Sequence, residues 1–513
     1  MKSFKSLFIL LFSLLIISCS QDDGKISFTV LQINDVYEIA PIQNGQYGGM
    51  ARVETVHQEL LAKDQNTMLV IAGDFLNPSL VGTMKYEGKK VSGRQMIDVM
   101  NAMNLDLAAF GNHEFDVKEK ELEERLDESN FPWISANVFH VTEKDTIAFT
   151  QSLNGTEQKV VGSYIREISD EDGTNIKVGF ISTCINSNPK DFVYYTEAKQ
   201  AIVDEYNKIK EEVDVVLGLT HVSIAEDKEI AALLPDIPLI MGGHEHTHIS
   251  EKVGNVSIKK ADANAKSAYI HTINFDKNKK ETSVESLLKY IDTTVAFNPK
   301  VEAVVKKWQD IMDTEISKVV DDPYCVIYNS EVPLIGKDTP IRSVQTNLGE
   351  IVATSMSYSY DGKVDCAFIN GGAIRIDDDL IGDINSVDIF RVLPYGGKVM
   401  NVTMTGKLLK QVLEFGENAA GSGAYLQRFD AKKDGEVWKV QGKTILETKN
   451  YKVAMIDYLL LGLDIPFLTP ETKGIVSVYV PKEDELPFDV RKATIDYLKK
   501  ESDKGNLELP ACN

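Results

Sequence analysis

The stretch LDLAAFGNHEFD, residues 105–116, joins a short apolar run to an abrupt polar turn. Five other runs between residue 26 and about residue 260 have the same design: ISFTVLQIN (26–34), TMLVIAG (67–73), VGFIST (178–183), VDVVLGLT (213–220) and IPLIMGG (237–243). Amphipathic stretches separate them, and such alternation is typical of strands and helices that follow one another along the chain. This half of the sequence therefore predicts an α/β domain with layered sheets.

Candidate metal- or phosphate-binding residues follow five of these six runs directly. They are Asp35, Asp74, Asn112 with His113, His221 and His244. In open α/β sheets, ligands bind beyond the carboxyl ends of the strands. We therefore expect five separate segments to bring these side chains to one edge of the fold.

The residue types suit a centre with two hard cations. Such a centre needs a bridging carboxylate, further carboxylate or amide oxygens and neutral imidazoles, with open positions for phosphate oxygens and a nucleophilic water. Each candidate is a weak signal alone, because an Asp after a strand is usually a turn residue and a single His is usually a satisfied polar group. Their joint order along the chain is the stronger signal.

In that order, GD (73–74), GNHEFD (111–116), TH (220–221) and GGHEH (242–246), the sequence resembles the calcineurin-like metallophosphoesterases. The resemblance implies a four-layer α/β sandwich and a centre for two divalent ions such as Mn²⁺, Zn²⁺, Co²⁺ or Mg²⁺. Its implied ligands are Asp74 as the bridge, Asn112, His221 and His244 at one position, and Asp35 and His246 at the other.

The same resemblance gives His113 and Asp116 a catalytic role. His113, as a cation or a hydrogen-bond donor, would stabilise the charge that develops on the phosphoryl group, and Asp116 would hold its orientation. The implied nucleophile is a metal-activated water, so that no covalent intermediate is needed.

Tyr37 is a departure from the family pattern. The family usually has Asp-x-His at the first motif, whereas this sequence has Asp35, Val36 and Tyr37. Either water, Tyr37 or Glu38 fills the missing ligand position, or that metal is bound more weakly. An inactive site is the alternative interpretation.

The second half of the sequence has its own motifs: IRSVQTNLGEIVA (341–353), AFINGGAIR (367–375), VLPYGGKV (392–399) and DYLLLGLD (457–464). They resemble the 5′-nucleotidase C-terminal domain over nearly all of residues 321–510. The implied substrate-binding residues are Arg342, Asn370, Arg375, Tyr395, Tyr458 and Asp464. The two arginines would contact the phosphates, the two tyrosines would sandwich the base, Asn370 would hydrogen-bond the nucleotide, and Asp464 would accept hydrogen bonds from the ribose hydroxyls.

The N-terminus resembles a targeting segment. Lys2 and Lys5 precede an apolar run at 7–17, and the run closes with Ile16-Ile17-Ser18-Cys19, which resembles the bacterial lipobox. Residues 1–19 are therefore interpreted as a lipoprotein signal peptide, with Cys19 as the lipid-anchored residue of an exported cell-envelope protein. A plain secretory signal is the alternative.

The rest of the chain divides into three parts. Residues 20–295 are predicted to form the metallophosphoesterase domain. Residues 296–320 have apolar residues at helical spacing after Asn298-Pro299, which predicts a linker helix. Residues 321–513 are predicted to form the substrate domain, and a length of 513 residues agrees with two domains.

Composition excludes some partners. The chain has 55 Lys and Arg against 77 Asp and Glu, which argues against electrostatic binding to nucleic-acid polymers or to anionic lipid surfaces. An acidic protein can still bind phosphate where metal ions supply local positive charge. The widely spaced cysteines are expected to be buried free thiols: Cys184, Cys325, Cys366 and Cys512.

The leading functional hypothesis from the sequence is metal-dependent hydrolysis of nucleoside 5′-monophosphates to nucleosides and phosphate. Alternatives that share this architecture are a 2′,3′-cyclic-nucleotide phosphodiesterase and a UDP-sugar hydrolase. A third is a broad phosphatase that uses the second domain as a lid. An inactive surface nucleotide-binding protein, suggested by Tyr37, is the alternative outside the enzymes.

Overall fold

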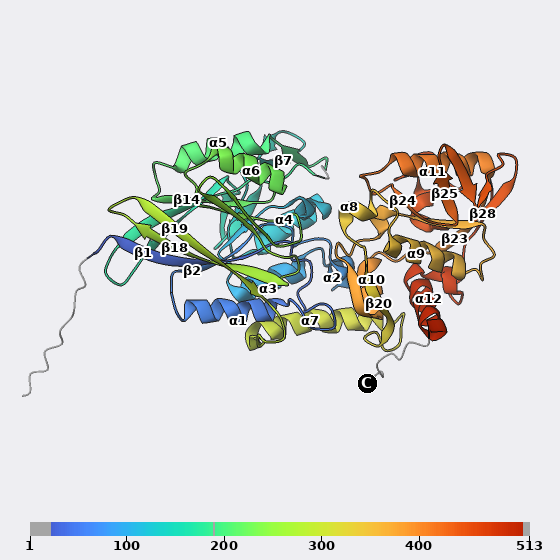
Figure 1. The fold of residues 1–513 in the computed structure, drawn as a ribbon, viewed down its shortest axis with the longest axis horizontal. Coiled ribbons are helices and arrows are strands. Elements are labelled where there is room, and N and C mark those ends of the chain that lie inside the picture. The colour runs from blue at the N-terminus through green and yellow to red at the C-terminus, as the bar shows by residue number, and fades with distance from the viewer. Residues whose placement is uncertain (1–21, 188–189, 506–513) are drawn as a thin grey trace, which may run out of the picture.

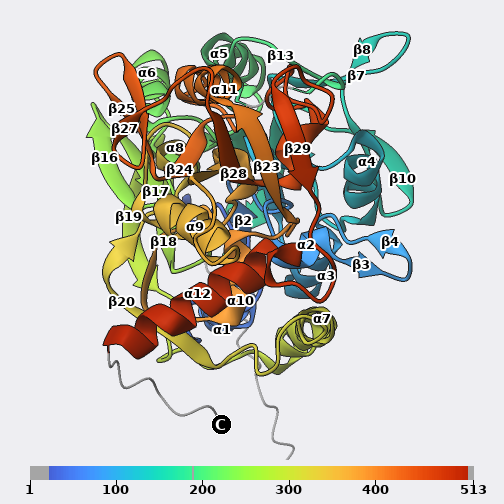
Figure 2. The ribbon, with the colours of Figure 1, turned by 90° about the vertical axis from the view of Figure 1, so that its right-hand side faces the viewer.

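The computed structural model describes residues 22–187 and 190–505. The predicted signal peptide, Cys19 and Cys512 lie outside the described residues. Figure 1 shows two lobes side by side, the first coloured blue to yellow-green and the second orange to red. The view in Figure 2 places the second lobe in front of the first.

Two six-stranded sheets form the centre of the first lobe. The first sheet has the strand order β19 (Glu281–Tyr290), β18 (Ser267–Asp276), β1 (Lys25–Ile33), β2 (Thr67–Ile71), β5 (Leu107–Ala109), β6 (Trp133–Ile134). The second has the order β11 (Ser163–Ser169), β12 (Asn175–Ile181), β14 (Val215–Thr220), β15 (Leu239–Gly242), β17 (Val256–Lys260), β16 (Ile249–Val253). Neighbours from β1 to β6 and from β12 to β17 are parallel, and the remaining pairs are antiparallel.

The two sheets pack face to face over one apolar core. Ile26, Phe28 and Val30 of β1 point into this core, together with Val178 of β12 and Leu217 of β14. The alternate residues of β1 belong to a different core on the outer face of the first sheet. Both faces of these strands are therefore buried, which explains their nearly continuous apolar sequence.

Helices cover the two outer faces of this sandwich and complete four layers. On the first sheet lie α1 (Met50–Leu61), α3 (Arg94–Met103) and α4 (Glu119–Glu128). On the second lie α5 (Ala198–Ile209) and α6 (Ile224–Leu233). The predicted α/β sandwich is confirmed, and five of the six apolar runs end at the turns that hold the candidate ligands.

The second lobe is built on a five-stranded mixed sheet. Its order is β24 (Leu426–Phe429), β21 (Cys366–Asn370), β28 (Asn450–Ile456), β23 (Val399–Thr405), β29 (Ile475–Tyr479). In Figure 1, α11 (Gly406–Asn418) lies on one side of this sheet, and α9 (Asn347–Tyr358) with α12 (Val490–Gly505) lies on the other. A two-stranded sheet of β20 (Val326–Leu334) and β22 (Leu380–Asn385), with α8 (Asp338–Ile341) and α10 (Ser386–Val392), faces the first lobe.

Helix α7 (Pro299–Ile316) leads from the first lobe to the second. It begins with Pro299 after Asn298, whose side chain accepts hydrogen bonds from the N–H groups of Lys300 and Val301. The indole N–H of Trp308 donates to Asp98 on α3, at 3.1 Å. The helix thus packs along α1 and α3 as part of the first lobe's helical layer.

One cysteine prediction is wrong. Cys184 and Cys366 are buried free thiols, as expected, but Cys325 is disulfide-bonded. Wide spacing along the sequence does not prevent two cysteines from meeting in space, and the sequence pattern does not report such a meeting.

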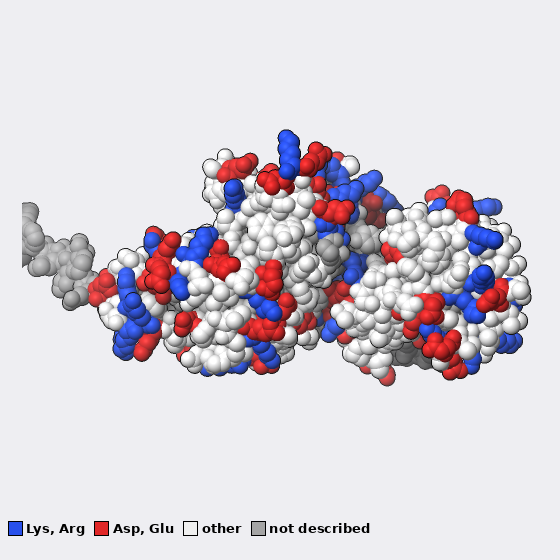
Figure 3. Space-filling view, turned by 90° about the horizontal axis from the view of Figure 1, so that it is seen from above, with Lys and Arg blue, Asp and Glu red and all other residues white. Residues whose placement is uncertain are grey.

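The surface in Figure 3 has acidic and basic side chains interspersed over both lobes. Among the described residues, helices that are long and apolar enough to span a membrane are absent.

Candidate metal centre and substrate pocket

The predicted ligands follow the carboxyl ends of five parallel strands, three in the first sheet and two in the second. Register aligns these ends: Ile33 lies opposite Ile71, and Thr220 lies opposite Gly242. The turns after β1, β2, β5, β14 and β15 therefore emerge level with one another. The five segments expected to meet at one edge do so where the two sheets face each other.

Four of the predicted ligands have unusual backbone conformations. The φ angles of Asp35, Asp74, His244 and His246 are 52°, 57°, 92° and 61°. Residues other than glycine rarely adopt this region, and such strain is concentrated at functional sites. Neighbouring backbone also crowds the turns: a Cβ added to Gly243 would lie 2.5 Å from the Ala72 carbonyl oxygen.

The side chains converge in a buried cluster. Asp35, Asp74 and His221 each offer a ligand atom within 4.8 Å of the other two. His221 Nε2 lies 3.0 Å from Asp74 Oδ2 and 3.9 Å from Asp35 Oδ1, and His246 Nε2 lies 3.3 Å from Asp35 Oδ1. These are distances that cations between the groups can bridge.

Hydrogen bonding shows that the cluster fits a metal centre. The Nδ1–H of His221 donates to the Ala72 carbonyl at 2.7 Å, which leaves the Nε2 lone pair facing the carboxylates without a hydrogen-bond partner. Asn112 Oδ1 is also buried without a partner. Buried acceptors that face one another are costly unless a cation binds them.

Electrostatics support the same conclusion. Burial acts to lower the pKa of His221 and of His246, but the neighbouring carboxylates outweigh it and raise these values to about 9 and about 10. The cluster therefore attracts positive charge strongly. His244 differs, since burial and the nearby His221 lower its pKa to about 4, which keeps it as the neutral imidazole that metals bind.

His113 and Asp116 form a pair beside this cluster. The Nδ1–H of His113 donates to Asp116 Oδ2 at 2.8 Å, and the His113 backbone N–H donates to Asp74 Oδ1 at 2.8 Å. Burial would lower the pKa of His113, but Asp74 and Asp116 raise it to about 9. His113 is thus a cation at neutral pH, held in one orientation.

Glu114 has a positioning role that the sequence did not reveal. Its carboxylate accepts hydrogen bonds from the backbone N–H groups of Asp74 at 2.8 Å, Phe75 at 2.7 Å, Leu76 at 3.1 Å and Gly111 at 2.6 Å. It therefore ties the GD turn to the GNHEFD turn. Its place inside the GNHEFD motif was the available signal.

Tyr37 points into the cluster. Its hydroxyl lies 3.0 Å from His246 Nε2 and 3.4 Å from Asp74 Oδ2. Glu38 is turned away and accepts a hydrogen bond from Arg391 of the second lobe at 3.0 Å. Of the two side chains considered for the missing ligand, Tyr37 is the one beside the centre.

A cavity of about 560 Å³ between the lobes contains all six predicted substrate-binding residues. It is lined by Arg342, Asn370, Arg375, Tyr395, Tyr458 and Asp464 from the second lobe, and by Asp116 and Lys190 from the first. An adjoining cavity of about 480 Å³ contains Asn112, His113, His244 and His246. Arg342 lines both cavities, so the two lie next to each other.

The polar groups of the larger cavity are preorganised. Asn370 Nδ2 donates to Asp464 Oδ2 at 2.8 Å, and the Tyr458 hydroxyl donates to Asp464 Oδ1 at 3.2 Å. Tyr395 is 56% exposed and Tyr458 is 37% exposed, so both rings are accessible to a ligand. Arg375 Nη2 lies 2.7 Å from Asp116 Oδ2, which joins the two lobes.

Lys190 is the residue of this cavity that sequence reasoning missed. It lies 3.4 Å from Asp116 Oδ1. Because it lies in a loop outside every recognised motif, the sequence pattern carried no signal for it.

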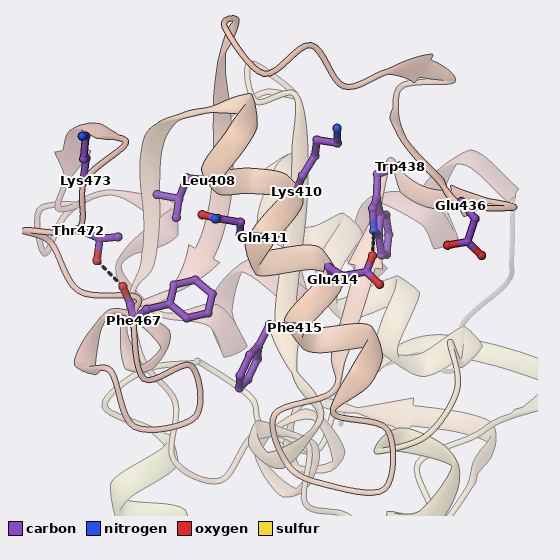
Figure 4. A pocket seen from close by; sticks show the side chains of 10 residues that line it. All are labelled: Leu408, Lys410, Gln411, Glu414, Phe415, Glu436, Trp438, Phe467, Thr472 and Lys473. Carbon is purple, nitrogen blue, oxygen red and sulfur yellow. Dashed lines mark hydrogen bonds between the residues drawn. The ribbon is translucent and has the colours of Figure 1, made fainter.

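A third cavity, of about 650 Å³, lies on the second lobe beside α11 and is shown in Figure 4. Leu408, Phe415 and Phe467 supply apolar surface, and the Trp438 indole donates to Glu414 at 2.8 Å. None of the predicted site residues lines it, so the candidate chemistry belongs to the interface between the lobes.

Comparisons with known proteins agree with this arrangement. The calcineurin-like phosphoesterase model matches residues 28–248, and the 5′-nucleotidase C-terminal domain model matches residues 326–469. The fold and the two matches define a calcineurin-like phosphoesterase domain followed by a 5′-nucleotidase C-terminal domain.

Relatives share most of the chain. The trifunctional nucleotide phosphoesterase protein YfkN of Bacillus subtilis is 28% identical to this chain, and the match covers 83% of this chain. YfkN is longer, and the match spans only 30% of its length. The 5′-nucleotidase of Homo sapiens is 25% identical over 79% of this chain and 74% of its own length. The structure of a 5′-nucleotidase precursor from Thermus thermophilus has a TM-score of 0.67 at 19% identity and covers 93% of this chain and 97% of its own, which shows a shared fold.

The chain belongs to the 5′-nucleotidase family and is a hydrolase of phosphoric esters. The family combines a calcineurin-like phosphoesterase domain with a 5′-nucleotidase C-terminal domain, acts on nucleotides and uses divalent metal ions.

Proposed function

We propose that this protein hydrolyses nucleoside 5′-monophosphates to nucleosides and phosphate. The observation that carries the proposal is that two neighbouring cavities share Arg342 as a lining residue. The other five substrate-binding candidates line the larger cavity, and His113 lines the smaller one with three of the candidate metal ligands, Asn112, His244 and His246. A ligand that fills both cavities would extend from exposed aromatic rings to a cluster that attracts cations.

In this proposal, six side chains hold two divalent metal ions: Asp35, Asp74, Asn112, His221, His244 and His246. When bound, the ions supply Lewis acidity and an activated water as the nucleophile. Oxygen and imidazole donors suit Mn²⁺, Co²⁺ and Zn²⁺, and Mg²⁺ less well, because Mg²⁺ prefers oxygen.

The side chains around the phosphate bind and orient it. His113, fixed by Asp116, donates a hydrogen bond to a phosphoryl oxygen as negative charge develops. Arg342 and Arg375 offer forked donors to the phosphate oxygens. Arg375 must exchange part of its contact with Asp116 for the substrate, which links substrate binding to the contact between the lobes.

The remaining candidates bind the nucleoside. Tyr395 and Tyr458 stack on the two faces of the base, and stacking tolerates any base. Asp464 accepts hydrogen bonds from the ribose hydroxyls, and Asn370 donates from beside it. We further propose that the second lobe rotates between open and closed states with its pivot at the linker region, residues 296–320, that separates the domains at 20–295 and 321–513.

Cyclic nucleotides are a second candidate substrate class, because they are also nucleotide phosphoesters and a relative from Bacillus subtilis is named a trifunctional nucleotide phosphoesterase. UDP-sugars are a third substrate class for the same panel. An inactive binding protein is the contrasting outcome.

We also propose that residues 1–19 direct export and that Cys19 carries a lipid anchor in the cell envelope. Labelling with a radioactive fatty acid would test this: the wild-type chain should incorporate label and Cys19→Ala should not. Label in neither protein would leave a plain secretory signal as the explanation.

The decisive experiment measures phosphate release by a protein that begins at residue 20, stripped with chelator and then supplied with Mn²⁺, Co²⁺, Zn²⁺ or Mg²⁺. The substrates are AMP, UMP, ADP, UDP-glucose and 2′,3′-cyclic AMP. We expect metal-restored turnover that is fastest on the monophosphates. Faster turnover of the cyclic nucleotide would replace the proposal, and nucleotide binding without turnover with any metal would identify an inactive binding protein.

A further inference from the structure

A short segment of the second lobe, residues 375–378, contacts the first lobe at three places. Arg375 Nη2 lies 2.7 Å from Asp116 Oδ2, and Asp378 Oδ2 lies 3.0 Å from the ammonium of Lys266. Between them, Asp377 Oδ2 lies 3.3 Å from Nδ1 of His246. Asp377 thus reaches a candidate metal ligand from the other lobe.

The two nitrogens of the His246 ring face different lobes. Nε2 faces the first lobe, 3.3 Å from Asp35 Oδ1 and 3.0 Å from the Tyr37 hydroxyl. Nδ1 faces the carboxylate and the backbone carbonyl oxygen of Asp377, each at 3.3 Å. Both of these oxygens can only accept a hydrogen bond, so Nδ1 keeps its hydrogen and Nε2 is the nitrogen that would offer its lone pair to an ion at the centre.

Asp377 is itself fixed in place. Its side chain is almost fully buried, and Oδ1 accepts a hydrogen bond from the backbone N–H of Asp338 at 2.7 Å. Its φ of 48° is in the left-handed region, which Asp and Asn tolerate better than most residues. A buried carboxylate that is held on one oxygen and directed at an imidazole with the other is the usual outer partner of a metal-binding histidine.

We propose that Asp377 is a positioning residue of the metal centre, supplied by the substrate domain. It selects the tautomer of His246 that binds metal, so that full affinity at the Asp35–His246 position requires the two lobes to be together. Coupling between two binding events is reciprocal. The contact between the lobes therefore strengthens ion binding at this position, and the bound ion strengthens the contact by the same factor. This inference rests on the proposed two-metal centre.

The test variant is Asp377→Asn, and the matched control is Asp378→Asn. The amide introduced by Asp377→Asn keeps the size and the tolerated backbone conformation, but its single side-chain oxygen cannot replace the two carboxylate oxygens that face Asp338 N–H and His246 Nδ1–H. The variant therefore removes the charged acceptor and leaves only the backbone carbonyl of residue 377 facing Nδ1. The control weakens the neighbouring Lys266 ion pair between the lobes without contacting a candidate ligand. Circular dichroism of both variants verifies folding.

Metal binding is measured without substrate, by calorimetric titration of the chelator-stripped proteins with Co²⁺. We expect wild type to bind two ions, and Asp377→Asn to bind one of them about 10-fold or more weakly while the other is unchanged. The control should stay within about 2-fold of wild type on both, as expected for a partly exposed ion pair. Two ions bound equally tightly by wild type and Asp377→Asn would overturn the inference and leave the proposed function intact.

A wild-type protein that binds fewer than two ions would instead overturn the two-metal centre.

A second measurement tests the linkage, with spin labels on exposed residues of the two lobes. Co²⁺ should shift the distance distribution of wild type toward the closed arrangement and shift that of Asp377→Asn less. Equal shifts in the two proteins would contradict the coupling.

Discussion

The two proposed metal positions differ in what holds their histidines. His221 donates its Nδ1–H to the Ala72 carbonyl, within the first lobe, at 2.7 Å. His246 is held through Asp377 from the second lobe, at 3.3 Å, and its position has Tyr37 where the family has a histidine. The first position is therefore a property of one domain, whereas the second depends on the arrangement of both.

The largest effect should come from removing the carboxylate that the two positions share. Asp74→Ala should lower kcat on AMP by on the order of 10³-fold, the scale of losing several kcal/mol of transition-state stabilisation. Metal stoichiometry should fall from two to at most one. Asp310→Ala, at an exposed ion pair on α7, is the control and should have wild-type values. Retention of both ions by Asp74→Ala would show that this residue is not the bridge.

Removing the ring of Tyr395 distinguishes the two proposed roles of the second lobe, which are binding of the base and support of His246. Tyr395→Ala should raise KM for AMP by roughly 10-fold or more, since a stacked base contributes about 1–3 kcal/mol. Slow hydrolysis of a simple aryl phosphate and the affinity for Co²⁺ should not change. An unchanged KM for AMP would remove Tyr395 from the base site.

Restoring the family histidine sharpens the comparison between the two positions. Tyr37→His should tighten the weaker Co²⁺ site by at least about 10-fold, because even an outer partner of a ligand changes affinity by 10–100-fold. In the Tyr37→His background, Asp377→Asn should have a smaller effect than in wild type. Weaker metal binding by Tyr37→His would indicate that the tyrosine itself is a ligand in this chain.

The smallest effect is expected at Lys190, which lies in the first lobe 3.4 Å from Asp116 Oδ1. Lys190→Met should raise KM for AMP by about 3-fold, because a partly exposed charge pair contributes less than about 1 kcal/mol. Steady-state kinetics with AMP and ADP measure this. A loss of kcat above 100-fold would place Lys190 in the chemical step instead.

The sequence predicted the first lobe well because its signals are local. An apolar run predicts a strand, and the residue after it must lie at the strand's carboxyl end, which places Asp74, Asn112 and His221 without knowledge of the rest. The six candidate substrate-binding residues also lie together in one cavity, and each of them belongs to a motif of several residues. Their individual roles remain predictions.

Contacts between distant segments were not predicted. Asp377 lies two residues after a recognised motif and has no local pattern, so its contact with His246 depends on how the lobes meet. The same holds for the pairing of Glu38 with Arg391 and for the disulfide at Cys325. Such contacts depend on packing between segments that are far apart in the sequence, and the spacing of apolar residues does not predict them.

The place of β1 inside its sheet has a consequence for the order of folding. This first strand lies between β2 and β18, with Lys25 opposite Asp276, and the turn that holds Asp35 is closed by Asn264, whose N–H donates to the Asp35 carbonyl at 2.8 Å. In a chain that emerges from its N-terminus, Asp35 is thus the first candidate ligand to be synthesised, but its turn is closed only after residue 264 has been made. Such distant pairing slows folding, and a chain stopped before residue 264 lacks one side of its metal centre.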